Sequence, residues 1–236
     1  FEGSKDIGGH NLGNLIFLSL MDITGSFMGA IQAISRILKV KGTILPSTLD
    51  TVTLYAMMED GTLVRGENNI PTLNNSIDHV FYQKRVEPQR DALKAIRKAD
   101  LIIYGIGSLY TSIMPNLIIP EIVDEIKRNP CQKIYFCNAM SQPGETDDFS
   151  VEDHIRAIEK HSFKNAVDLA IVNDSYIPQN ILEAYAKQGS YPVKIKEHEH
   201  SYRIIVRKLI MFDEKGRIRH NPDAVKKVIE EVIQTI

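Results

Sequence analysis

The chain has 236 residues, of which 43% are hydrophobic and 25% are charged. This length and composition predict one substantial hydrophobic core, or one core with a small additional lobe. The formal net charge of −2 at pH 7 argues against a nucleic-acid-binding protein, because general affinity for nucleic acid requires a strongly basic surface.

Neither a membrane span nor a secretory signal is predicted. The apolar run from Leu15 to Leu20 is too short to cross a bilayer, and the start of the chain does not resemble a cleavable signal. In such a chain Cys131 and Cys137 are interpreted as reduced core residues. We expect a cytoplasmic protein, and because Phe1 is not preceded by an initiator methionine, we expect the later part of a longer one.

The first 84 residues predict two helices followed by a small β-rich insertion. Helical periodicity covers residues 11–23 and 26–40, and strand character begins at 43–47. Two extended runs within 51–70 flank the Asp60-Gly61 pair, which is a strong hairpin signal, and residues 77–83 predict another strand. We place the antiparallel β insertion at about 43–84 of a single domain spanning 1–236.

From Pro88 onward helices and strands alternate, which predicts a Rossmann-like α/β fold with a parallel sheet flanked by helices on both faces. The predicted strands end near Gly105, Asn138, Asp174 and Ile195. The remaining segments predict helices, namely 88–99, 115–128, 151–161 and 178–188. A hairpin at 204–221 and a helix at 222–236 complete the prediction.

A glycine-containing turn between a buried strand and a helix is the best candidate for a ligand site. Residues 105–112 read GIGSLYTS, which lacks both the lysine of a Walker A loop and the third glycine of a dinucleotide motif. Their position still predicts a phosphate-binding turn, with an ordinary tight turn as the alternative. The candidate contacts are Gly105, Gly107, Ser108, Leu109, Tyr110, Thr111, Ser112 and Asn116.

A second polar cluster follows the next predicted strand, and it should face the first because neighbouring parallel strands end at one edge of a sheet. Its members are Asn138, Ser141, Gln142, Glu145, Thr146, Asp147 and Asp148. The carboxylates could hold Mg²⁺ on a phosphate group, with Asp147 as the candidate ligand. The alternative is that Asp148 or Ser150 caps the helix that begins at Val151.

Two further segments offer candidate contacts near helix or strand ends. His10, Asn11 and Asn14 lie beside Gly9 and Gly13 at a helix start, where a phosphate contact and simple capping are equally consistent with the sequence. Residues 45–50 place Thr48 at a strand end, where turn chemistry is the alternative. No nucleophile elbow or convincing zinc-ligand spacing is present, and no catalytic residue is assigned.

Several of these motifs together resemble one family across essentially the whole chain. They are GHNLGNL, LPSTLD, MEDGTLVRGE, GIGSLYTSIMPNLIIPEI, NAMSQPGETDDFSVEDHI and RHNPDAV. The combination is similar to the gluconeogenesis factor (YvcK-like) branch of the 2-phospho-L-lactate transferase (CofD-like) superfamily. The family pattern also begins with a strand, a Gly-Gly-Gly-Thr-Gly loop and an Asp-Asp-Gly-Gly-Ser-Ser-Gly segment, which this sequence does not contain.

The resemblance implies a Rossmann-like protein that binds a nucleotide sugar such as UDP-N-acetylglucosamine, without turnover. It also implies a role in growth on gluconeogenic carbon sources, in cell shape and in peptidoglycan supply, with a homo-oligomer or a cell-wall synthesis regulator as partner. The alternative is the transferase branch, which uses a nucleoside-diphosphate-linked donor and Mg²⁺. By motif, the implied contacts are Asn11, Asn14, Gly107 to Ser112, Asn116, Asn138, Glu145, Asp147 and Arg219.

Overall fold

The computed structural model describes residues 12–73, 75–197 and 199–235, which divide into two compact units, Phe1–Leu49 and Asp50–Ile236. The first unit contains the two predicted helices, α1 (Leu12–Thr24) and α2 (Phe27–Ile37). The predicted strand at 43–47 is wrong, because these residues form no regular element. His10 and Asn11 lie outside the described residues. Since Asn14 and Thr48 belong to the first unit, their part in a site of the second remains a prediction.

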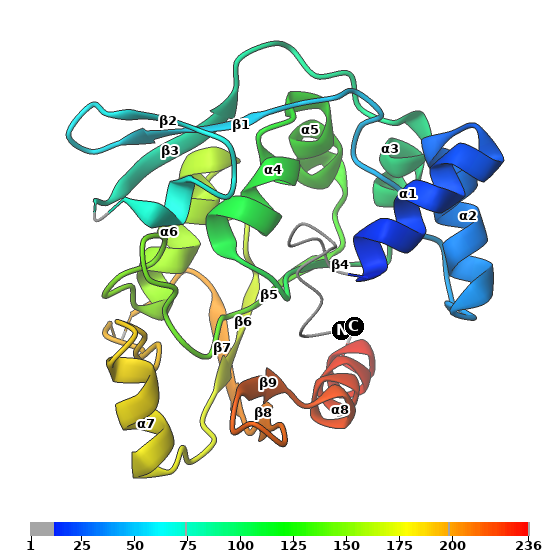
Figure 1. The fold of residues 1–236 in the computed structure, drawn as a ribbon. Helices are drawn as coiled ribbons and strands as arrows, with labels where there is room; N and C mark the ends of the chain where they lie inside the picture. The colour runs from blue at the N-terminus through cyan, green and yellow to red at the C-terminus, as the bar shows by residue number, and fades with distance from the viewer. Residues whose placement is uncertain (1–11, 74, 198, 236) are drawn as a thin grey trace. The chain divides into compact units, whose positions relative to one another are not determined.

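A parallel sheet forms the centre of the second unit (Figure 1). In its described part the strand order is β4 (Leu101–Tyr104), β5 (Gln132–Phe136), β6 (Leu169–Asn173) and β7 (Arg203–Arg207). All three pairings are parallel, with Tyr104 beside Tyr135 and Ile171 beside Ile205. The predicted α/β fold with a parallel sheet is therefore confirmed.

Helices cover both faces of this sheet, as predicted. On one face Tyr135 and Ala170 share a core with buried residues of α5 (Pro120–Arg128) and α6 (Val151–His161). On the other face Ile134, Phe136, Leu169 and Ile171 pack with Val228 and Val232 of α8 (Pro222–Ile233). Because successive strand residues point to opposite faces, strands buried on both sides need the continuous apolar runs of the sequence.

The predicted β-rich segment is an antiparallel sheet of order β2-β1-β3, within the described residues. Its strands are β1 (Leu54–Met58), β2 (Leu63–Arg65) and β3 (Ile77–Tyr82), with the short 3-10 helix η2 (Ile70–Thr72) before β3. The Asp60-Gly61 pair lies in the turn between β1 and β2, as predicted. Leu54, Ala56 and Met58 belong to the same core as the helices over the parallel sheet, so this sheet is no separate lobe.

Three further predicted elements needed correction. The strand predicted at 191–195 makes only an isolated bridge between Pro192 and Met140, and β7 is the fourth parallel strand. The predicted terminal hairpin is therefore limited to β8 (Ile210–Phe212) and β9 (Ile218–His220). Three of the five residues of β7, Arg203, Val206 and Arg207, are exposed because the strand lies at the edge of the described sheet, so its sequence resembles a hairpin strand.

The third correction concerns the helix predicted at 115–128. Helical structure begins earlier, in the π-helical turn η3 (Leu109–Ile113), and continues through α4 (Met114–Leu117) before α5. The break before α5 falls at Pro120, whose ring has no N–H to continue the backbone hydrogen bonds. The other helices are α3 (Arg90–Arg97) and α7 (Gln179–Ala186). Among the described residues, no helix has the length and apolar character that a membrane crossing requires.

Candidate functional site

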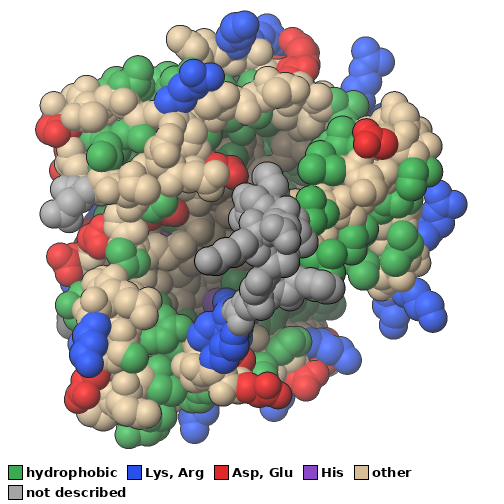
Figure 2. Space-filling model, viewed as in Figure 1, with side chains coloured by type: hydrophobic (Ala, Val, Ile, Leu, Met, Phe, Trp, Pro, Cys, Tyr) green, Lys and Arg blue, Asp and Glu red, His purple; other side chains and the backbone are tan. Residues whose placement is uncertain are grey.

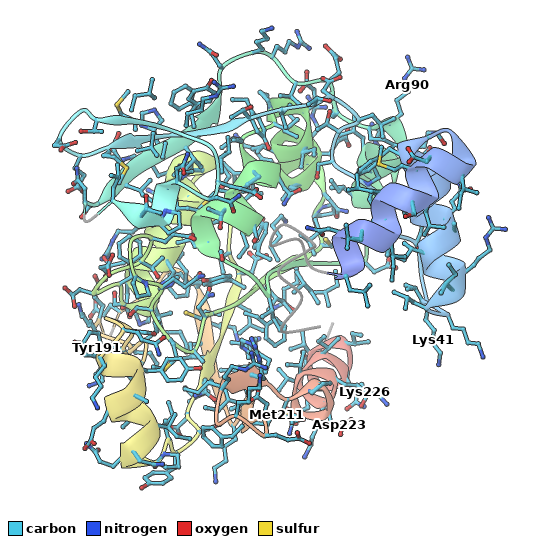
Figure 3. All side chains as sticks on the ribbon, in the orientation of Figure 1. Lys41, Arg90, Tyr191, Met211, Asp223 and Lys226 are labelled. Atoms are coloured by element: carbon cyan, nitrogen blue, oxygen red, sulfur yellow. The ribbon has the colours of Figure 1, made fainter. Side chains whose placement is uncertain are left out.

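A cavity of about 460 Å³ lies at the carboxyl ends of β4 and β5. Four segments of the second unit line it: the turn after β4, the loop after β5, the end of α7 with the residues that follow, and β9. Tyr191 and Met211, labelled in Figure 3, mark the segment after α7 and the hairpin strand β8. The lining residues are Ile106, Gly107, Ser108, Asn138, Ala139, Met140, Ser141, Gln142, Pro143, Tyr185, Gln188, Ser190, Ile218, Arg219 and His220.

The turn after β4 requires glycine at its first position. Gly105 has φ of 103°, and a Cβ there would lie 3.2 Å from the Phe136 carbonyl oxygen. After Ser108 the chain becomes helical, and the amides of Ser112 and Ile113 both donate to the Ser108 carbonyl at 3.0 Å. The first amides of such a helical segment have no acceptor within the helix, and one of them, that of Tyr110, donates to the Glu145 carboxylate at 3.3 Å instead.

The helical conformation after Ser108 also decides which atoms of several predicted contact residues are exposed to a ligand. Leu109 and Tyr110 are 0% and 2% exposed, so only their backbone could contact a ligand. Ser112 and Asn116 are exposed on the helical segment, and the Asn116 side-chain amide donates to the Ser112 carbonyl at 2.9 Å. Of the predicted contacts, the cavity brings together Gly107, Ser108, Asn138 and Arg219.

The loop after β5 holds the turn after β4 through direct side-chain hydrogen bonds. Asn138 donates from Nδ2 to the Gly107 carbonyl at 3.0 Å, and Gln142 donates from Nε2 to Ser108 Oγ at 2.8 Å. This contact confirms the prediction that the two loops face each other. Both loops therefore form one wall of the cavity.

The buried side chain of Glu145 also links the same two loops. Glu145 is 6% exposed, and its carboxylate accepts from the Tyr110 amide at 3.3 Å and from Thr111 Oγ1 at 3.1 Å. Burial raises the pKa of Glu145, and these hydrogen bonds oppose that rise. Thr146 is also buried, and its Oγ1 accepts from the Gln142 amide at 2.9 Å. Both residues stabilise the loops, and a direct ligand contact by either remains a prediction.

The predicted Mg²⁺ ligand Asp147 is exposed, and its Oδ2 accepts from the Gly144 amide at 2.7 Å. It is not among the residues that line the cavity. Of the two capping alternatives, the structure supports Ser150, which forms a reciprocal capping box with Asp153 at the start of α6. The described residues contain no group of three or more His, Cys, Asp or Glu that could hold a metal ion, so binding of Mg²⁺ at Asp147 remains a prediction.

The strand β9 supplies the positive charge of the cavity. The Arg219 side chain is 57% exposed, and its Nε lies 3.8 Å from Asp213 Oδ2. Beside it, burial lowers the pKa of His220, whose Nε2 has no hydrogen-bond partner among the described residues. Tyr185 of α7 is hydrogen-bonded to this strand, because its hydroxyl accepts from the Ile218 backbone amide at 2.8 Å. Sequence reasoning missed His220 and Tyr185, because no local pattern brings α7 and β9 together.

The charge of the cavity favours an anion. None of the described residues that line it is Asp or Glu, whereas Arg219 is charged and Ser108, Asn138 and Gln188 offer polar groups. Over the molecule as a whole no sign of charge dominates, and Figure 2 shows acidic and basic side chains interspersed on the face that it presents. The site therefore suits one small anionic ligand.

Comparison with known proteins assigns the family. The model of the family described as 2-phospho-L-lactate transferase CofD matches residues 1–210 of this chain. The chain belongs to the CofD family. Among curated relatives of this CofD-family chain, the protein named gluconeogenesis factor of Halalkalibacterium halodurans is 38% identical, over 98% of this chain and 73% of its own length. The protein of the same name from Bacillus subtilis is also 38% identical, over 99% of this chain and 75% of its own.

The fold of this CofD-family chain is also similar to solved structures. The crystal structure of a member of the UPF0052 family from Bacillus halodurans superposes with a TM-score of 0.87 at 39% identity, covering 94% of this chain and 72% of that one. A further crystal structure from the same organism gives a TM-score of 0.89 at 39% identity, over 97% and 75%. These similarities agree with the α/β fold described above.

Proposed function

We propose that this CofD-family chain is a gluconeogenesis factor that binds a nucleotide sugar, such as UDP-N-acetylglucosamine, in the cavity beside β9. The observation that carries the proposal is the convergence of the Gly107–Ser108 turn, Asn138 and Arg219 on one cavity whose described lining contains no carboxylate. The curated relatives named gluconeogenesis factor support the broader role.

The chemistry of these groups matches a diphosphate. An arginine guanidinium offers paired N–H donors with the geometry of two phosphate oxygens, and the backbone amides of Gly107 and Ser108, which line the cavity, would add uncharged donors. The cavity volume of about 460 Å³ lies within the range of small-molecule sites. The side chains of Tyr185 and Gln188, which also line the cavity, would contact the base or the sugar.

We further propose that the protein acts in the cytoplasm as a sensor without turnover, which reports the level of the nucleotide sugar to cell-shape control and peptidoglycan supply. The titratable groups that line the cavity are Arg219, His220 and Tyr185, within the described residues. Burial lowers the pKa of His220 and so favours its neutral form. A neutral imidazole would contact the ligand through a hydrogen bond and not through a charge. A regulator of cell-wall synthesis is the kind of protein partner that this role requires.

Titration calorimetry on the full-length protein tests the proposal, with UDP-N-acetylglucosamine compared with UDP and GDP. Arg219→Gln should weaken binding of the sugar nucleotide roughly 10- to 100-fold, the value of a charge-assisted hydrogen bond. Arg217→Gln is the matched control, because Arg217 lies on the same hairpin but is paired with Asp213 at 2.7 Å and does not line the cavity. Absence of heat with UDP-N-acetylglucosamine, while another nucleotide binds, would contradict the proposed ligand.

The second candidate function is a phosphotransferase, which the match to the 2-phospho-L-lactate transferase family favours. Such an enzyme would take a nucleoside-diphosphate-linked donor in the same cavity and use Mg²⁺. Incubation of the full-length protein with labelled donor, Mg²⁺ and a deazaflavin or simple alcohol acceptor separates the two. Transfer of label supports the enzyme, whereas binding without transfer supports the sensor.

A further inference from the structure

A buried tyrosine lies directly behind the turn that bounds the proposed ligand cavity. Tyr135 of β5 is 0% exposed, and its hydroxyl donates to Asn138 Oδ1 at 3.1 Å. The other end of the same amide, Asn138 Nδ2, donates to the Gly107 carbonyl at 3.0 Å. A continuous chain of two hydrogen bonds therefore runs from the core of the sheet to the cavity wall.

These two hydrogen bonds determine which way the side-chain amide of Asn138 faces. An amide has one acceptor end and one donor end, and a hydroxyl donor at the first end leaves the NH₂ group for the Gly107 carbonyl. Burial raises the pKa of Tyr135 well above its usual range, so the hydroxyl keeps its proton. Burial likewise raises the pKa of the neighbouring Cys137 thiol to about 12.

The Gly107 carbonyl matters because it belongs to the same planar peptide group as the amide of Ser108. In a trans peptide the carbonyl and the N–H point in opposite directions, so fixing one fixes the other. A hydrogen bond from Asn138 therefore sets the direction of the N–H of Ser108, a residue that lines the cavity. Gln142 holds the Ser108 hydroxyl independently at 2.8 Å.

We infer that Tyr135 is a positioning residue, which orients the Asn138 amide and through it the Gly107–Ser108 peptide for the anionic part of the ligand. This inference rests on the proposed function for its effect on binding. Its effect on the turn itself does not depend on the identity of the ligand. The two consequences can therefore be measured separately.

The test compares Tyr135→Phe with Tyr104→Phe in the full-length protein. Tyr104 is the matched control: it is 5% exposed, lies beside Tyr135 in the sheet, and its hydroxyl has no hydrogen-bond partner in the described part of the chain. The first readout is amide hydrogen exchange at Ser112 and Ile113, whose N–H groups donate to the Ser108 carbonyl. The second readout is affinity for UDP-N-acetylglucosamine.

We expect Tyr135→Phe to accelerate exchange at these two amides and to weaken ligand binding, each roughly three- to tenfold, as for loss of one buried hydrogen bond. Tyr104→Phe should change neither. Tyr135→Phe with wild-type exchange at Ser112 and Ile113 would overturn the inference, as would equal effects of Tyr104→Phe. If the wild-type protein does not bind this ligand, the proposed function fails, whereas the exchange result still decides the role of Tyr135.

Asn138→Ser keeps the test decisive if Tyr135→Phe folds poorly. It removes both ends of the amide, and it should accelerate exchange at Ser112 and Ile113 at least as much as Tyr135→Phe. Adding Tyr135→Phe to Asn138→Ser should then cause no further loss of affinity, because the hydroxyl acts through the amide. Additive losses in the double variant would show that Tyr135 acts independently of Asn138 and would refute the inference.

Discussion

Removal of the Glu145 carboxylate offers a sharp test of how the two loops are held together. Glu145 is 6% exposed and accepts from the Tyr110 amide and from Thr111 Oγ1. In Glu145→Ala the buried Tyr110 N–H loses its acceptor, whereas the partly buried Thr111 hydroxyl can be hydrated. Glu145→Gln keeps an amide oxygen for the Tyr110 N–H and carries no charge.

The magnitude follows from these contacts. A buried donor left without an acceptor costs about 1–3 kcal/mol, and loss of the second hydrogen bond adds about 1 kcal/mol. We therefore expect Glu145→Ala to lower the free energy of unfolding by about 2–4 kcal/mol. For a chain of this length the corresponding fall in Tm is roughly 4–16 °C, at about 2–4 °C for each kcal/mol.

The pH dependence separates the hydrogen bonds from the buried charge. Burial raises the pKa of Glu145 above its ordinary value of 4.5, so the folded protein binds the proton more tightly than the unfolded chain. The stability contributed by the protonated form is fully present below pH 4.5 and is lost as the pH rises through the folded pKa. Glu145→Gln, which cannot ionise, should not show this loss.

Urea unfolding of the wild type and Glu145→Gln from pH 4.5 to 8 measures the effect. The free energy of unfolding of Glu145→Gln, relative to wild type, should rise with pH and then level off. Glu214→Gln is the control, because Glu214 is exposed in the turn between β8 and β9. A constant difference between Glu145→Gln and wild type across this range would refute the reasoning, as would a Glu145→Ala variant as stable as wild type.

Two further changes test the loop and the β3–α6 contact. Gly144 has φ of 77°, and a Cβ there would lie 2.1 Å from the Pro71 carbonyl oxygen. Gly144→Ala should therefore lower the Tm by at least twice as much as Gly61→Ala, because Gly61 has φ of 85° but open space around it. Equal shifts of the two variants in a thermal melt would contradict this. The neutral His161 ring accepts at Nε2 from the Val80 amide at 3.0 Å, and burial lowers the pKa of His161. The contribution of His161 to the free energy of unfolding is therefore present above pH 6.5 and is lost as the pH falls through the lowered pKa. In urea unfolding, wild type should lose stability below pH 6.5 relative to His161→Gln, and parallel pH curves would disprove this role.

Local sequence patterns predicted the elements whose environment is uniform. Buried strands such as Ile134–Phe136 are apolar on both faces, and the Asp60-Gly61 turn has a fixed backbone requirement, so both could be recognised from their residues alone. The edge strand β7 could not, because among the described residues it has a neighbouring strand on one side only, and three of its five side chains are exposed. Its pairing with β6 joins two segments that lie far apart in the sequence, and no local sequence pattern describes such a pairing.

The candidate site divides in the same way. The sequence predicted that the turn at Gly107 and Ser108 and the loop at Asn138 would meet, because parallel neighbours end at the same edge. It did not predict that Glu145 would lie beneath the turn, because the direction of a side chain within a loop depends on its packing. Nor did it predict the approach of Tyr185 and His220 from α7 and β9.

The sequence by itself determined the α/β class, the glycine-containing turn between strand and helix, and the resemblance that the family comparison confirmed. These features depend on residue type and spacing along the chain, which are local properties. Only the tertiary structure decided which polar side chains line the cavity and which hold its walls, as Tyr135 and Glu145 do. That distinction depends on burial and hydrogen-bond partners, which exist only after distant segments have packed together.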